Sequence, residues 1–128
     1  MKDETRIWIE YAEENFKSAK ILLKSKLFNP CMQNIQQSIE KSLKSVLVEN
    51  SIGLKRAHSI SDLKHTLEEN NFTVMMTDDD CDFIDSIYLP SKYPLISVLP
   101  NFEPNEEICN KGILLAEKVL EQVKIVLI

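Results

Sequence analysis

The sequence predicts an all-α protein, an antiparallel up-and-down four-helix bundle with one short extra helix. Hydrophobic residues recur at three- and four-residue steps over three long stretches, which is the spacing of one helical face. Only 2 of the 128 residues are glycine, and a β-rich domain of this length would need more glycine in its tight turns. The length suits one hydrophobic core, so we expect a single domain over residues 1–128.

The first predicted helix runs from about Asp3 to Lys26 and is amphipathic. Its apolar face begins at Trp8, a residue that we expect in the core or at a dimer interface. Three lysines lie on or near the polar side of this helix: Lys17, Lys20 and Lys24. The first half of the chain is therefore expected to present a basic helix surface.

The break before the second helix is predicted at Asn29-Pro30. Asn29 is the expected N-cap, and Pro30 is the expected first residue of a helix that continues to about Glu49. Because this connection is short, the first two helices are expected to pack antiparallel.

The next stretch is predicted to be a short helix between two loops. Gly53 indicates the end of the second helix and a loop. Ser59 or Ser61 is the expected N-cap of the third helix, which ends near Asn70. Residues 72–76 are apolar but have no partner strand in the sequence, so we expect a loop there.

The last two helices are separated by a proline-rich segment. The fourth helix is expected to begin at Thr77 or Asp78, with the acidic residues 78–80 complementing the helix dipole. Proline recurs across residues 89–105, which predicts a surface loop. The final helix is expected from about Pro104 to Leu127.

Charge is distributed unevenly along the chain. Residues 1–65 carry a net charge of +3 and residues 66–128 carry −8, which together give −5. An anionic ligand is therefore expected on the first half. The acidic balance disfavours non-specific nucleic-acid binding, but a local basic face can still bind phosphate.

The spacing of the cysteines and the hydropathy of the chain bear on whether the protein is metal-binding, disulfide-bonded or membrane-bound. Cys31, Cys81 and Cys109 are far apart and have no histidine or cysteine at ligand spacing, so we expect reduced thiols, no cofactor and no metal. No apolar run approaches the length of a membrane span, and the N-terminus lacks an apolar signal core. We therefore expect a cytoplasmic protein that does not contact a membrane.

Four segments carry a specific pattern of residues. The segments are Trp8, Ala12 and Ala19; Gln36-Gln37-x-x-Glu40-Lys41-x-Leu43-Lys44; His58-Ser59-Ile60; and Tyr88-x-x-x-Lys92-Tyr93-Pro94. In order and spacing they resemble the HEPN domain family, small helical proteins of bacteria and archaea that are often encoded beside minimal nucleotidyltransferases. The resemblance covers roughly residues 8–94 and matches the final helix only in character.

The resemblance implies a helical bundle, a homodimer and one of two functions. One branch of the family is ribonuclease-like and carries an R-x(4–6)-H motif near the final long helix. The only arginines of this sequence are Arg6 and Arg56, and its only histidines are His58 and His65. The intervals between them do not form that motif. Because metal-free RNA cleavage needs a proton acceptor and a cationic stabiliser at one phosphodiester, the sequence favours a non-catalytic protein.

The expected function is that of a nucleotide- or RNA-binding module acting with a minimal nucleotidyltransferase partner, in a pair of the toxin–antitoxin kind. The expected nucleotide-binding residues are Gln37, Lys41, Lys44, His58, Lys92 and Tyr93. The lysines would meet phosphates in a shallow cleft, and the ring of Tyr93 would stack on a base.

Each of these residues also has a structural interpretation. The second helix can present a solvated polar face with a Glu40–Lys44 pair. His58 can fix its loop by packing against a neighbouring helix, and Tyr93 can anchor its own loop.

Two other functions stay open at this point. One is a ribonuclease toxin with a site rewired around His58 and either Arg56 or Lys92. The other is a purely structural protein–protein interaction module, in which the first and last helices form the interface.

Overall fold

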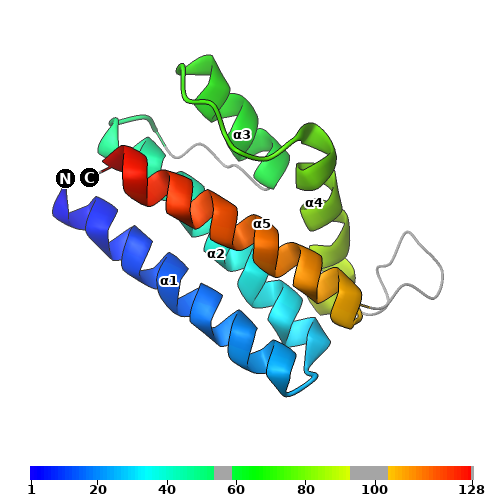
Figure 1. Ribbon diagram of the computed structural model, residues 1–128. Helices are drawn as coiled ribbons and strands as arrows, with labels where there is room; N and C mark the ends of the chain where they lie inside the picture. The colour runs from blue at the N-terminus through cyan, green and yellow to red at the C-terminus, as the bar shows by residue number, and fades with distance from the viewer. Residues whose placement is uncertain (54–58, 93–103, 128) are drawn as a thin grey trace.

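The computed structural model describes residues 1–53, 59–92 and 104–127, and these ranges contain helices and no strand. The helices are α1 (Asp3–Lys24), α2 (Phe28–Glu49), α3 (Ile60–Glu69), α4 (Asp78–Lys92) and α5 (Glu106–Leu127). Figure 1 shows α1, α2 and α5 as long rods that run side by side, with both chain termini at the same end of the bundle. The short α3 and α4 pack against α2 and against each other. The all-α fold with one short extra helix is therefore confirmed.

The central helix is α2, which packs against all four others. Its largest fully buried side chains include Met32, Ile35, Ile39, Leu43 and Leu47. Small residues bring α1 close to α2, since Ala12 and Ser38 are fully buried and Ser38 Oγ donates to the Ala12 carbonyl at 2.9 Å. α1 is thus held tightly along its α2 side.

The close approach of α5 to α2 depends on Gly112. A Cβ atom at this position would lie 2.9 Å from Ile35 Cδ1 and 3.4 Å from Met32 Sδ. The missing side chain therefore allows the two helices to pack in contact. Near this contact Cys31 and Cys109 are both fully buried.

Two of the predicted helix caps are confirmed. Ser59 Oγ accepts a hydrogen bond from the Asp62 amide at 3.0 Å at the start of α3. At the start of α4, the Asp80 amide donates to Thr77 Oγ1 at 3.0 Å and the Thr77 amide donates to Asp80 Oδ2 at 3.1 Å. This reciprocal pair is a capping box, and it explains the acidic first turn of α4.

Two long-range polar links also join α3 to α4. The Asp85 carboxylate accepts from the amides of Ile60 at 2.8 Å and Ser61 at 3.1 Å. The buried Lys64 donates to Asp78 at 2.7 Å. This hydrogen bond raises the pKa of Lys64 and lowers the pKa of Asp78. The short helix is therefore fixed by side chains of its neighbour.

Two predictions about the ends of α2 are corrected by the structure. α2 begins at Phe28, with Leu27 as an N-cap that makes no side-chain hydrogen bond. Pro30 thus sits in the first turn, where an amide has no intrahelical partner to lose. α2 ends in a left-handed residue, but this residue is Ser51 (φ 55°) rather than Gly53. The amides of residues 51 and 52 bond back to the last turn and close the helix there.

The proline-rich segment begins later than predicted. α4 continues through Pro90 to Lys92, because the fixed φ of proline suits a helix and its missing amide removes only one hydrogen bond from the last turn. The predicted loop over residues 93–103 lies outside the described residues. α5 then begins at Glu106 with Asn105 Oδ1 accepting from the Ile108 amide at 2.9 Å.

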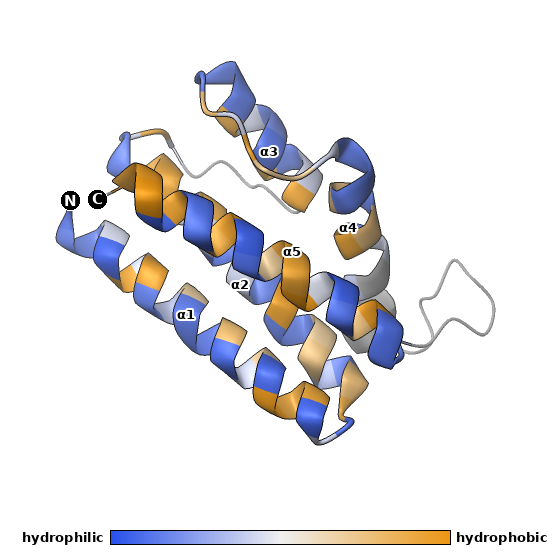
Figure 2. Cartoon of the chain, viewed as in Figure 1, coloured by the Kyte–Doolittle hydropathy of each residue, from blue (hydrophilic) through white to orange (hydrophobic). Residues whose placement is uncertain are grey.

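Hydropathy follows the packing of the helices (Figure 2). Hydrophilic residues are frequent on α1 and α3, and α5 becomes strongly hydrophobic towards its C-terminal end. No helix in the described part of the chain is both long enough and apolar enough to cross a membrane.

Candidate anion-binding site

Three of the six predicted binding residues have described side chains, and they follow one ridge of α2. Gln37, Lys41 and Lys44 are all half-buried. Lys92 is the last residue of α4, but its side chain lies outside the description. His58 and Tyr93 also lie outside the described residues, so no distance relates these three to the ridge.

A carboxylate organises one part of this ridge. Glu40 Oε1 accepts from Lys44 Nζ at 2.6 Å, and Glu40 Oε2 accepts from Gln37 Nε2 at 3.2 Å. Gln37 Nε2 also donates to Gln36 Oε1 at 2.7 Å, and Gln36 is 5% exposed. The Glu40–Lys44 pair of the structural interpretation is therefore present, and both glutamines join it in one network.

A second chain of hydrogen bonds crosses from α2 to α1. Lys41 Nζ donates to Asn15 Oδ1 at 2.8 Å. The amide of Asn15 donates in turn to Asn34 Oδ1 at 3.0 Å, and Asn34 donates to the Pro30 carbonyl at 2.9 Å. Lys41 is thus held against α1 by a neutral partner, which leaves its positive charge uncompensated.

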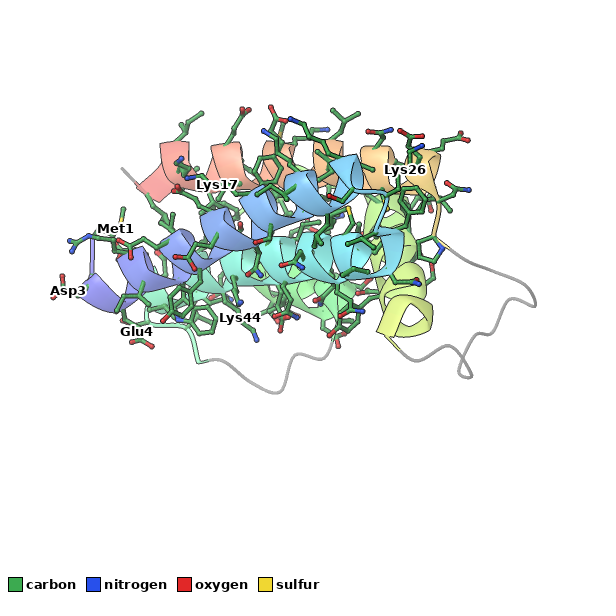
Figure 3. All side chains as sticks on the ribbon, turned by 90° about the horizontal axis from the view of Figure 1, so that it is seen from below. Met1, Asp3, Glu4, Lys17, Lys26 and Lys44 are labelled. Carbon is green, nitrogen blue, oxygen red and sulfur yellow. The ribbon has the colours of Figure 1, made fainter. Side chains whose placement is uncertain are left out.

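Two aromatic rings of α1 complete the arrangement. Lys44 Nζ lies 5.7 Å from the centre of the Trp8 ring, and Lys41 Nζ lies 5.8 Å from the centre of the Tyr11 ring. Both distances fall in the range of cation–π contacts. Trp8 is half-buried beside Lys44 and is not part of the buried core. Figure 3 shows Lys44 on the side of α1 opposite to Lys17.

These connected side chains of α1 and α2 form the seam cluster: Trp8, Tyr11, Asn15, Gln37, Glu40, Lys41 and Lys44. Sequence reasoning missed the aromatic and asparagine members. Their spacing on the first helix places them on one face, but the rotation of this helix against the second one was needed to bring them to the lysines.

The chemistry of the seam cluster suits a small anion. Its two lysines and one carboxylate leave one net positive charge. Each ammonium group has three N–H donors, and the hydrogen bonds to Asn15 and Glu40 use one on each lysine. The remaining donors can meet phosphate oxygens while the neighbouring rings offer a flat apolar surface.

The concave surface expected beside this ridge stays a prediction. Four surface hollows are lined by described residues, and none of these four includes Gln37, Lys41 or Lys44. The largest of the four, about 370 Å³, lies at the end of the bundle where Asn50, Asn70 and Asn71 meet.

The five helices and this polar seam define the chain as a small helical-bundle domain with a preorganised basic surface. Residues 5–126 match the profile of the HEPN domain family, and the chain belongs to that family. Comparison with curated proteins gives no match.

Solved structures agree over nearly the whole chain. TT1696 from Thermus thermophilus is 24% identical, with a TM-score of 0.83 over 96% of this chain and 98% of that one. ST0689, described as an archaeal HEPN homologue, is 27% identical, with a TM-score of 0.71 over 97% of both chains. An HEPN domain protein from Thermotoga maritima, TM0613, is 18% identical, with a TM-score of 0.71 over 94% of this chain and 96% of that one.

Proposed function

We propose that this HEPN domain is a non-catalytic module that binds a nucleotide or RNA at the seam cluster. In this proposal the domain works as a homodimer together with a minimal nucleotidyltransferase, in a toxin–antitoxin-like pair. The dimer and the enzyme partner are carried over from the family. A role without catalysis is supported by the sequence, in which no histidine follows residue 65.

The observation that carries the proposal is the placement of two lysines against two aromatic rings. Lys41 and Lys44 are held in fixed positions before any ligand arrives, because Asn15 and Glu40 already bind them at 2.8 and 2.6 Å. A preorganised cation loses less side-chain entropy on binding than a free surface lysine. In this arrangement the lysines would take phosphate oxygens, and Trp8 or Tyr11 would stack on a base.

The test is a titration of the protein with labelled ATP and with a short panel of RNA oligonucleotides. Trp8 is the single tryptophan of the chain, so its fluorescence is a second readout at the site itself. We expect saturable binding that weakens about tenfold or more in Lys41→Ala and in Lys44→Ala, since a lost charged hydrogen bond is worth about 1.5–3 kcal/mol. Lys26→Ala, an exposed lysine outside the seam cluster, is the matched control.

Three results would contradict the proposal. Absence of binding to every probe would remove the nucleotide-binding function, and equal affinity in all lysine variants would remove the seam cluster as the site. Cleavage of any RNA in the panel that is lost in His58→Ala would instead favour the ribonuclease alternative.

A further inference from the structure

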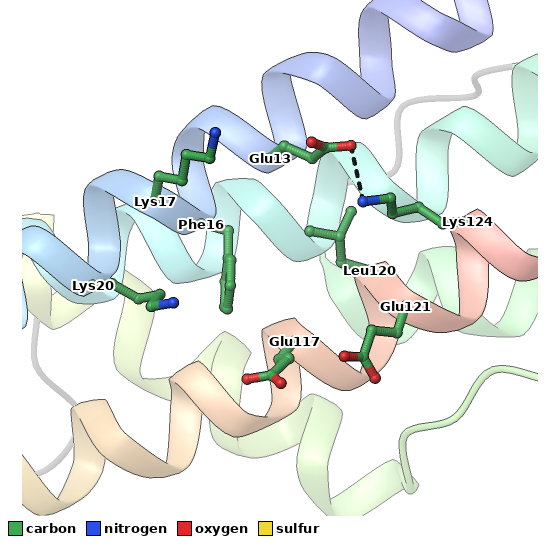
Figure 4. A pocket seen from close by; sticks show the side chains of 8 residues that line it. All are labelled: Glu13, Phe16, Lys17, Lys20, Glu117, Leu120, Glu121 and Lys124. Carbon is green, nitrogen blue, oxygen red and sulfur yellow. Dashed lines mark ion pairs between the residues drawn. The ribbon is translucent and has the colours of Figure 1, made fainter.

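A concave surface lies between α1 and α5, and its floor is apolar. This groove has a volume of about 270 Å³. Phe16 of α1 and Leu120 of α5 line its base, the first half-buried and the second 6% exposed. Figure 4 shows charged side chains along both edges of the groove. The seam cluster lies on the other side of α1.

The two edges of the groove carry opposite charges. Lys17 and Lys20 stand on the α1 edge, whereas Glu117 and Glu121 stand on the α5 edge. None of these four side chains forms an ion pair with a described residue. The groove therefore has a basic and an acidic edge whose charges are available to a partner.

An ion pair sets the register of the two edges. α1 and α5 run antiparallel (Figure 1), and Glu13 of α1 meets Lys124 of α5 at 3.3 Å. On antiparallel helices, two residues that are equally many positions away from this pair, one after Glu13 and one before Lys124, lie at the same height along the bundle. Lys20 is therefore at the height of Glu117, and Lys17 is nearly at the height of Glu121. At every level of the groove, the charge on α1 is thus opposite to the charge on α5.

We propose that this α1–α5 face is a homodimer interface covered by a second copy of the chain, with a two-fold axis parallel to the groove. The proposal rests on the homodimer of the proposed function and gives it a surface and a geometry. Rotation by 180° about that axis lays α1 on the α5 of the second copy. Lys20 then faces Glu117 of the second copy, and Lys17 faces Glu121, in both halves of the interface.

The same charges favour this arrangement over the other face-to-face one. A two-fold axis in the plane of the face but across the helices would lay α1 on α1 and α5 on α5, and at the middle of the groove it would set Lys17 against its own copy and Glu121 against its own copy. Like charges brought together in an interface are strongly unfavourable. The sign pattern therefore favours the axis parallel to the groove, which opposes unlike charges at every level.

Exposed apolar residues and the size of the face also fit a second copy. Ile21 is 65% exposed and Leu114 is 68% exposed, and both lie beyond Lys20 and Glu117 at the same end of the groove. The rotation brings Ile21 of one copy towards Leu114 of the other. Two helices of about 33 Å, together about 20 Å wide, offer about 650 Å² per copy, or about 1,300 Å² in total, which falls within the range of specific interfaces.

The experiment reverses one edge of the groove at a time. Lys17→Glu with Lys20→Glu forms one variant, and Glu117→Lys with Glu121→Lys forms the other. We expect each reversal to weaken the homodimer about 100-fold or more, measured by sedimentation velocity at low salt, because four contacts per dimer become repulsive. The matched control is Asp62→Lys with Glu69→Lys on the exposed surface of α3, which should leave the dimer unchanged.

The decisive step is to mix the two reversed variants. In the heterodimer, the reversed α1 of one variant faces the reversed α5 of the other, and the second pair of helices keeps its wild-type charges. An equimolar mixture should therefore form a heterodimer close to wild type in affinity. Circular dichroism checks that both variants fold, and Leu114→Arg gives an independent way to break the interface without changing the groove charges.

Several outcomes would overturn the interface. A dimer that persists in both reversed variants, or a mixture that fails to pair, would show that the copies meet elsewhere while the homodimer of the proposed function stands. A wild-type chain that stays monomeric would remove both the interface and the homodimer. Nucleotide binding at the seam cluster is measured separately, so its failure is distinguishable from each of these results.

Discussion

The charged side chains along the two sides of α1 differ in whether they already have partners. Towards α2, Lys44 is bonded to Glu40 and Lys41 is bonded to Asn15, so both cations have partners within the chain. Towards α5, Lys17 and Lys20 stand opposite acidic residues without an ion pair to any described residue. α1 thus lies between two basic surfaces: one carried by α2, whose lysines already have partners in the chain, and one carried by α1 itself, whose lysines form no ion pair with a described residue.

This difference predicts which substitutions change the stability of the fold and which change association with a partner. Hydrogen bonds among half-buried side chains gain strength from reduced solvent screening, and breaking one leaves its partner without compensation. Charges at the exposed edges of a groove contribute little to folding, because water and salt screen them. We therefore expect substitutions on the α2 side of α1 to change the free energy of unfolding and substitutions on the α5 side to change only binding to a partner.

The largest effect is expected when the α2 side of α1 is forced open. Ala12 is fully buried, and its carbonyl accepts a hydrogen bond from Ser38. Ala12→Leu adds three carbons where the two helices touch, so we expect a loss of about 3 kcal/mol in the free energy of unfolding. Urea denaturation followed by circular dichroism measures this loss.

The control for this substitution lies on the exposed surface of the same helix. Glu14→Leu places the same leucine side chain at an exposed position, where an effect within about 0.5 kcal/mol is expected. Equal losses in the two variants would contradict the tight contact between α1 and α2.

A smaller effect, dependent on pH, is expected at the end of the same side. The Glu49 carboxylate accepts from the Lys2 amide at 2.9 Å and from the buried Thr5 hydroxyl at 2.9 Å. These hydrogen bonds, that of Lys2 first, lower the pKa of Glu49 below its ordinary value of 4.5. A carboxylate with a lowered pKa stabilises the fold above its unfolded pKa and loses this contribution as the pH falls through the folded pKa.

Glu49→Gln should therefore be less stable than wild type at pH 7, and the difference should shrink as the pH falls below about 4.5. Thermal unfolding between pH 7 and pH 3 measures it. Glu121→Gln in the α1–α5 groove is the comparison, because Glu121 accepts no hydrogen bond from a described residue. A difference for Glu49→Gln that stays constant over this range would contradict the role of the carboxylate.

The features that the sequence predicted are those that depend on neighbouring residues. The Ser59 cap and the Thr77–Asp80 capping box follow from residues three positions apart, and the helical spacing of apolar residues marked the three long helices. The carboxylate of Asp85 at the start of α3 joins residues 24 and 25 positions apart, and no local pattern predicts such a contact.

The residues of the candidate site also fall into a group that was predictable from neighbouring positions and a group that was not. Gln37, Lys41 and Lys44 share one helix, so their common ridge was predictable from spacing alone. Trp8 and Tyr11 reach these lysines only because of the angle at which α1 packs on α2, which is a result of side-chain packing along the whole contact. The preference of proline for the first helical position predicted that α2 begins at Pro30, two residues too late. Proline fits any position in the first turn of a helix, so its presence alone does not fix the residue at which the helix begins.

The smallest effect is expected for the ion pair that crosses the groove. Glu13 and Lys124 meet at 3.3 Å, but their side chains are 36% and 43% exposed. A double-mutant cycle with Glu13→Gln and Lys124→Gln should give a coupling energy of only about 0.5 kcal/mol in the monomer, because exposed pairs are screened by water. Carried out on Leu114→Arg, in which the proposed interface is broken, the cycle measures the pair within one chain. A coupling of several kcal/mol in that background would show that the α5 side of α1 also contributes to folding, and the distinction between the two sides would then fail.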